Sequence, residues 1–247
     1  MQSKINSCIN FANQILDNQS IINNNLSNTS TVGFKSKFSY LVRTYSKNNK
    51  NVTNKFVTYR DNSLGQFNTT NQPLDIAIIH KDRWLIVKTN KNKIYLTKNG
   101  SIKINKENFF TINGNLLIGI DKKPIKIPKN NVPKIQNDGT VIVRNSVNLT
   151  SYKKKIGQIG CKKISINKLL ETSNGLFKIK KEYLNKYRNK INTIEIKTGV
   201  LEGSNVNPIT NITNIMSQSR TFEMLMKIIY TKNENEKRTN QVLNINS

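Results

Sequence analysis

Residues 199–208 read Gly199-Val200-Leu201-Glu202-Gly203-Ser204-Asn205-Val206-Asn207-Pro208, and they run directly into a long segment with helical periodicity. The other end of the chain has a counterpart, since residues 5–28 also repeat apolar side chains at steps of three and four. Between these segments lie short apolar runs typical of strands. Two helices at opposite chain ends, each with one apolar stripe, favour a subunit that assembles through its termini.

The N-terminal segment is predicted to be an amphipathic helix over residues 5–28. Its apolar positions are Ile5, Ile9, Ala12, Ile15, Leu16, Ile22 and Leu26. This spacing places them on one face of a helix. Asparagine has poor helix propensity, and the run from Asn28 to Gly33 supplies the stop signal.

The C-terminal segment is predicted to be a second amphipathic helix over residues 209–230. Asn207 is a suitable N-cap, and Pro208 is tolerated in the first turn. The apolar positions that follow are Ile209, Ile212, Ile215, Met216, Phe222, Leu225, Met226, Ile229 and Tyr230. At 1.5 Å per residue this helix would span about 33 Å.

The middle of the chain is predicted to be a small antiparallel β-domain. Apolar runs occur at 74–79, 84–87, 94–96, 109–112, 116–120, 125–127, 141–143 and 176–179. Asn-Gly pairs at 99–100 and 113–114 and Asp-Gly at 138–139 favour hairpin turns between them. The expected fold is α+β, with the N-terminal and C-terminal helices paired as a coiled coil and this small antiparallel β-domain formed by the middle of the chain. We expect an assembly helix at 1–34, an extended linker at 35–73, the β-domain at 74–190, and a motif plus assembly helix at 191–247.

Composition leaves two functional classes open. The 247 residues include 40 Lys and Arg but only 14 Asp and Glu, a net charge of +26. Such a balance is typical of proteins that bind nucleic acid or an anionic membrane surface, so a basic RNA-associated protein of ribosomal type is one hypothesis. However, the lysines are scattered, with only short runs at 153–155 and 162–163, which we expect to be exposed. Frequent Asn, Ile and Lys are also what mutational drift in an A/T-rich genome produces.

The sequence offers no pattern for catalysis, and we expect neither an enzyme nor a cofactor or metal. His80 is the single histidine and has no acid or cysteine partner at the spacing of a triad or metal site. Cys8 and Cys161 form no cluster; free thiols are favoured, and one bridge between them stays open. No run of 18 apolar residues exists, so no membrane insertion is expected. The N-terminus also lacks the apolar core of a cleaved signal peptide.

Three motifs, in order, resemble the bacterial flagellar rod and hook family. Residues 23–28 (Asn-Asn-Asn-Leu-Ser-Asn), then Thr31, Gly33 and Phe34, are similar to its Ala-Asn-Asn-Leu-Ala-Asn … Thr-x-Gly-Phe signature. Residues 74–78, Trp84 and 95–100 resemble its Leu-Asp-x-Ala-Ile … Tyr-Thr-Arg-x-Gly pattern, although Arg83 replaces a glycine there. Residues 201–207 resemble the second signature. Gly203, Pro208 and the segment 220–227 are most similar to subunits of the proximal rod.

The resemblance implies a structural subunit of the flagellar basal-body rod, exported by the flagellar apparatus without a cleaved leader. It implies that copies of the chain and other rod proteins are its partners, with no nucleic acid or small-molecule ligand. Its termini would form the inner layer of a tube. The residues expected at the assembly interface are Ile15, Leu16, Ile22, Asn25, Leu26, Asn28, Leu201, Ser204, Asn205, Val206, Ile212, Ile215, Met216, Phe222, Met226 and Ile229.

Energetics favour termini that gain their order on assembly. Burial of one Leu-sized or Ile-sized side chain contributes about 1.5–3 kcal/mol. Ordering the backbone costs about 1–2 kcal/mol for each residue. Each terminal stripe offers few such positions, so the helices are expected to be marginal in a single subunit and to be stabilised by neighbours.

Overall fold

The computed structural model describes residues 2–45, 52–145, 154–172, 175–187 and 190–245. The chain divides into two compact units. The terminal unit contains Met1–Ser27, Lys37–Tyr59 and Asn207–Ser247, and the central unit contains Asn28–Ser36 and Arg60–Val206. The chain therefore passes between the units at four places.

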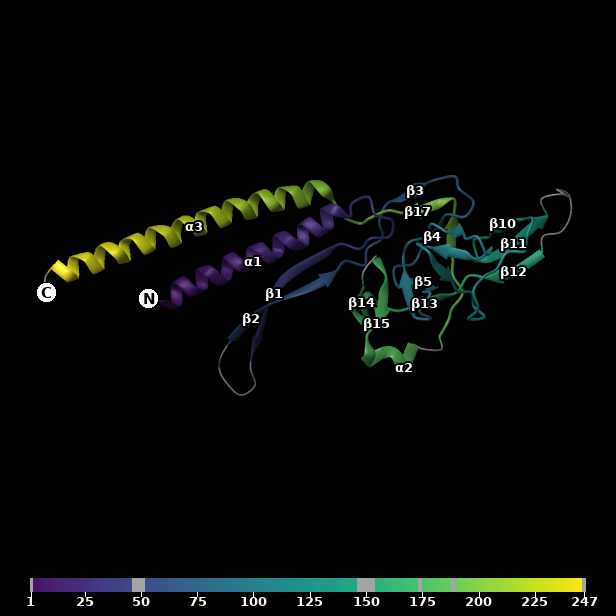
Figure 1. Cartoon of the computed structure of the whole chain (residues 1–247), viewed down its shortest axis with the longest axis horizontal. Helices are drawn as coiled ribbons and strands as arrows, with labels where there is room; N and C mark the ends of the chain where they lie inside the picture. The colour runs from purple at the N-terminus through teal and green to yellow at the C-terminus, as the bar shows by residue number, and fades with distance from the viewer. Residues whose placement is uncertain (1, 46–51, 146–153, 173–174, 188–189, 246–247) are drawn as a thin grey trace. The chain divides into compact units, whose positions relative to one another are not determined.

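The terminal unit consists of two helices and one hairpin. Helix α1 (Gln2–Ser27) and helix α3 (Pro208–Ile245) run antiparallel beside each other (Figure 1). One hydrogen bond joins them, from Gln19 Nε2 to Ser219 Oγ at 3.3 Å. Strands β1 (Lys37–Tyr45) and β2 (Val52–Arg60) pair as a two-stranded sheet, and β1 contacts α1. The N-cap prediction is confirmed, because Asn207 Oδ1 accepts a hydrogen bond from the Thr210 N–H at 3.2 Å.

The prediction that the terminal helices pair as a coiled coil is wrong, although the α+β class is consistent with the structure. A coiled coil needs an interlocked apolar seam on both helices. Helix α1 buries Ala12, Ile15, Ile22 and Asn25. In α3, none of the described side chains is buried. Part of α1 contacts strand β1 rather than α3. The Asn25 Nδ2 donates to the Lys37 carbonyl at 2.7 Å, and the Lys37 N–H donates to Asn25 Oδ1 at 2.8 Å.

The central unit contains most of the strands. They are β3 (Phe67–Thr69), β4 (Ile76–Ile78), β5 (Arg83–Lys88), β6 (Ile94–Thr97), β7 (Lys103–Ile104), β8 (Phe110–Ile112), β9 (Asn115–Leu117), β10 (Asn131–Ile135), β11 (Thr140–Asn145), β12 (Lys154–Gln158), β13 (Cys161–Lys163), β14 (Leu169–Glu171), β15 (Phe177–Ile179), β16 (Ile196–Thr198) and β17 (Val200–Glu202). The short helices are η1 (Ile166–Lys168), η3 (Lys181–Tyr183) and α2 (Leu184–Tyr187).

These strands form one large sheet and three smaller ones. The large sheet has the order β14-β15-β6-β5-β9-β8-β7, and β13 also pairs with β5. Strands β10-β11-β12 form a three-stranded sheet, while β16 pairs with β4 and β17 with β3. The β-domain is thus antiparallel as predicted. The segment 35–73, expected to be an extended linker, contains β3 of the central unit and also β1 and β2 of the terminal unit. The predicted strand at 125–127 is instead a buried segment with an isolated bridge from Lys126 to Phe109.

Strand β5 is buried on both faces and organises the core. Because side chains alternate along a strand, Leu85 and Val87 enter one apolar cluster while Trp84 and Ile86 enter another. Continuous burial on both faces explains why residues 84–87 are an uninterrupted apolar run rather than an alternating one.

Two of the predicted Asn-Gly and Asp-Gly turns are hairpin turns, and the third is not. Asn113 and Gly114 have φ values of 49° and 77° between β8 and β9, as a two-residue hairpin turn requires. Gly139, between β10 and β11, has a φ of 78°. Gly100 has no such φ and serves a different purpose: a Cβ there would lie 1.6 Å from the Ile76 carbonyl oxygen. Among the described residues, no helix is both apolar and long enough to span a bilayer.

We predict that Gly100→Ala destabilises the central unit more than Gly114→Ala does. An alanine at 100 collides with the backbone of the buried strand β4, which costs about 3 kcal/mol. Alanine at 114 meets nothing within 4 Å and introduces only left-handed backbone strain, worth about 1–2 kcal/mol. Free energies of unfolding from urea titration measure both. Equal losses would contradict the close approach of Gly100 to β4.

Candidate functional site: the junction of the two end motifs

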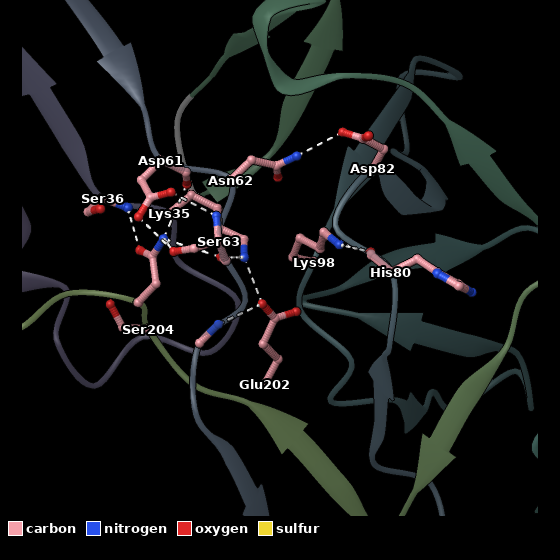
Figure 2. A network of polar contacts seen from close by, with 12 residues as sticks. Lys35, Ser36, Asp61, Asn62, Ser63, His80, Asp82, Lys98, Glu202 and Ser204 are labelled. Atoms are coloured by element: carbon pink, nitrogen blue, oxygen red, sulfur yellow. Dashed lines mark hydrogen bonds and ion pairs between the residues drawn. The ribbon is translucent and has the colours of Figure 1, made fainter.

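The first and last motifs of the sequence meet in the central unit through a buried ion pair. Lys35 Nζ lies 2.7 Å from Glu202 Oε1, and both side chains are 0% exposed. The Gly33 N–H also donates to the Glu202 carbonyl at 2.7 Å. Figure 2 shows Lys35 and Glu202 approaching from separate segments, with Ser63 close to Lys35. The two ends of the sequence are thereby joined across 167 residues.

The pair is supported by backbone groups of the segment 61–65. Lys35 Nζ also donates to the Ser63 carbonyl, and the Gly65 N–H donates to Glu202 Oε1 at 3.1 Å. Burying two charges carries a large desolvation penalty, which is offset only where the remaining hydrogen-bonding capacity is used. Of the two carboxylate oxygens, Oε2 of Glu202 is buried and has no protein partner in the described structure.

Lys98 is a second buried cation beside this pair. Its Nζ donates to the His80 carbonyl at 2.7 Å and lies 5.2 Å from the centre of the Trp84 ring. Burial lowers the pKa of Lys98 to about 8; the nearby Glu202 carboxylate acts in the opposite direction, and Lys35 lowers the pKa further. The cluster therefore contains two lysines for one neighbouring glutamate.

Asn205 ties three segments together beside the ion pair. Its Oδ1 accepts from the Ser36 N–H at 2.7 Å. Its Nδ2 donates to the Asp61 carbonyl at 3.2 Å and to the Ser63 carbonyl and hydroxyl at 3.3 and 3.1 Å. The Asp61 carboxylate in turn accepts from the Ser63 N–H and hydroxyl at 2.8 and 2.6 Å. Asn205 therefore fixes the segments next to three of the four passages between units.

Two glycines allow the segments to approach this closely. Gly33 has a φ of 69°, and a Cβ on it would lie 2.6 Å from the Lys98 carbonyl carbon. A Cβ on Gly65 would lie 2.1 Å from the Gly203 carbonyl oxygen. Any larger residue would force the backbones apart and separate Lys35 from Glu202.

The arrangement is that of a clamp, in which polar side chains are held by groups from other segments. Lysines, amides, backbone groups and the Ser63 hydroxyl, which donates to the Asp61 carboxylate, hold one another in place. His80 contacts Glu195 at 3.0 Å on the surface. Burial raises the pKa of the Cys161 thiol to about 11, and both Cys161 and Cys8 are free. No group of three metal-ligating side chains occurs in the described part of the chain.

The predicted interface residues fall into three groups. In and after α1, Ile15, Ile22 and Asn25 are buried, Leu26 and Asn28 are half-buried, and Leu16 is exposed. In the C-terminal motif, Leu201, Ser204, Asn205 and Val206 are half-buried, and only Asn205 among them joins the clamp through its side chain. In α3, Ile215, Phe222 and Ile229 are half-buried, whereas Ile212, Met216 and Met226 are exposed. Their role in an interface stays a prediction.

Sequence reasoning missed Lys35, Ser63, Lys98 and Glu202. Lys35 and Glu202 stand inside or next to the recognised motifs, so their position was a usable signal. Their burial is not predicted from the sequence, because charged side chains are usually exposed. The same assumption was wrong for Lys162, which is buried and donates to the Tyr187 carbonyl. Lys153, from the other lysine run, lies outside the described residues.

The terminal unit carries a second candidate site, the outer apolar face of α3. Ile209, Met216 and Met224 are 73%, 54% and 59% exposed. At 100° per residue they lie on the opposite side of the helix from the half-buried Ile215, Phe222 and Ile229. A shallow groove between Met216 and Met224 is lined by Thr213, Arg220 and Thr221. Helix α3 is therefore apolar on two sides, of which the terminal unit covers one.

Comparison with known proteins places these motifs in context. Residues 197–242 match the family described as flagellar basal body rod FlgEFG protein C-terminal. The chain is 36% identical over 258 residues to the flagellar basal-body rod protein FlgF of Buchnera aphidicola from Schizaphis graminum, with 100% of both chains covered. It is 32% identical over 253 residues to FlgF of Salmonella typhimurium, covering 99% of this chain and 100% of that protein.

We predict that Lys35→Met alone is more damaging than Lys35→Met combined with Glu202→Met. The single change leaves a buried, unpaired carboxylate and is expected to cost about 3–5 kcal/mol, whereas two apolar side chains of similar volume remove both charges. Urea unfolding of the full chain gives both free energies. Additive losses would show that the two side chains do not act as a pair.

We predict that Lys98 makes stability rise with pH in the alkaline range. Its pKa is about 8 in the folded chain against an ordinary value of 10.5. Between these values the unfolded chain binds more protons, so the free energy of unfolding increases as pH rises from about 8 to about 10.5. The free energy of unfolding of the wild-type chain should show this increase, and that of Lys98→Met should not. The exposed Lys103 provides the control, since Lys103→Met should keep the wild-type dependence.

Proposed function

This chain belongs to the family of flagellar basal-body rod proteins, and we propose that it builds the rod by assembling through its terminal unit. Its function is that of a structural subunit of the basal-body rod, in association with other rod components. The comparisons give no support to the alternative of an RNA-associated protein. The role is structural, and we propose no catalysis.

The outer apolar face of α3 is the observation that carries this proposal. A helix with a single apolar face buries that face against the rest of its own protein. A second apolar face stays in contact with water unless another molecule packs against it. Ile209, Met216 and Met224 have no such cover in the single chain, since each of these side chains is at least 54% exposed. Exposed apolar surface of this kind marks a site of protein association.

Other parts of the terminal unit extend this surface. On α1, Phe11 and Leu16 are 46% and 48% exposed. On the hairpin, Phe38 and Tyr40 are exposed, and the Tyr40 and Tyr59 rings stack with centroids 4.5 Å apart. Aromatic side chains contribute large contact areas at interfaces. Together with α3, these residues support assembly through both termini and the hairpin.

The central unit is suited to a different task. All residues of its two apolar clusters belong to the unit itself. At the junction, the charged side chains of Lys35, Lys98 and Glu202 are all buried. We propose that it folds as a self-contained body carried by each subunit. Head-to-tail contacts between copies generate helical tubes. We further propose a place in the proximal rod, neighbouring rod proteins as partners, and delivery by the flagellar export apparatus.

We predict that Met216→Asp blocks incorporation into the rod while leaving the isolated chain folded. The side chain is 54% exposed in the single chain, so the charge is tolerated there. Once a neighbour covers it, an unpaired charge becomes costly. The measurements are motility in soft agar and the amount of the variant protein in purified basal bodies.

The matched control is Asn214→Asp, which adds the same charge at an exposed, already polar position of α3. It should assemble better than Met216→Asp. Circular dichroism of the purified variants checks that both remain folded. Normal incorporation of Met216→Asp would exclude the outer face of α3 from the assembly interface. The expectation that the terminal helices gain order on assembly stays a prediction.

A further inference from the structure

We infer that residues 196–205 are a closing strap, and that the central unit completes its fold by docking this segment last. The strap contains β16, β17 and the clamp residues Glu202 and Asn205. It follows in sequence after every other strand of the central unit.

The strap closes two strands that have no other strand partner among the described residues. Strand β16 pairs antiparallel with β4, from Ile196–Ile78 to Thr198–Ile76, and β17 pairs with β3, from Val200–Thr69 to Glu202–Phe67. Each is a two-stranded sheet of its own. Since a two-stranded sheet is marginal by itself, β3 and β4 depend on the strap for their pairing.

The strap also neutralises a buried charge. Lys35 has two described partners for its ammonium group, the Ser63 carbonyl and the Glu202 carboxylate. Before the strap docks, the cation lacks its counter-charge and must stay in contact with water. Docking therefore couples strand pairing to ion-pair burial in one step.

Sequence separation sets the order of events. The strap contacts join residues 167 and 169 positions apart, from Lys35 to Glu202 and from Ser36 to Asn205. The hairpins β5–β6 and β8–β9 join neighbours in sequence. Contacts that close long loops carry a larger entropy cost and form after local ones.

The rest of the core can collapse without the strap. The large sheet and the three-stranded sheet contain no strap strand. Among the buried members of the two apolar clusters, Ile196 alone belongs to the strap. The transition state of folding should therefore contain the large sheet and lack the Lys35–Glu202 pair.

Refolding and unfolding rates of the full chain test this order. The fluorescence of Trp84, the single tryptophan, reports on the core of the large sheet. Glu202→Gln keeps the shape of the side chain and removes its charge. We expect it to raise the unfolding rate on the order of 100-fold, with a refolding rate close to wild type, because a pair absent from the transition state affects unfolding alone.

Three further variants make the result decisive. Glu195→Gln is the matched control, since Glu195 is exposed and precedes the strap; it should change neither rate. Ile86→Val, in the buried core of β5, should slow refolding instead. Should Glu202→Gln fail to fold, Asn205→Ala probes the same docking step, and a faster unfolding rate is again expected. Slower refolding of the strap variants, with unchanged unfolding, would overturn the proposal.

Discussion

The buried contact between Lys35 and Glu202 is the constraint on which the central unit depends. Neither charge is exposed, so each needs the other, and each also needs a backbone group of the segment 61–65. An ion pair of this kind contributes little net stability by itself, because desolvation offsets most of the attraction. Its effect lies in specificity: only a register that places Lys35 beside both the Ser63 carbonyl and the Glu202 carboxylate pairs the buried ammonium group. Asn205 repeats the same requirement with neutral groups.

This requirement explains why glycines stand where they do. Gly33 brings the first motif against the backbone of Lys98, and Gly65 brings its segment against Gly203. Both approaches are shorter than any side chain would permit. The segments adjoining the passages between the two units are therefore fixed by backbone packing and a few buried polar atoms.

Local features of the sequence were predictive, and distant relationships were not. The structures of the turn at Asn113-Gly114 and of the apolar run at 84–87 could be predicted from the sequence. Turn geometry and burial on both faces of a strand each depend on a few neighbouring residues. The hairpin β1–β2 was missed, since its strands mix polar and aromatic residues in a segment that resembles a loop. Lys35 and Glu202 could not be paired from one sequence, because nothing in composition specifies a contact across 167 residues. The coiled-coil prediction was wrong because the apolar residues of α3 serve more than one face.

The sparse packing of α3 has a consequence for the lifetime of the chain. A helix of 38 residues without a buried described side chain opens readily, and segments that open readily are where proteases cut. Susceptibility in such a case follows the equilibrium population of the open form. In an unincorporated copy, α3 is therefore the segment that we expect a protease to cut first.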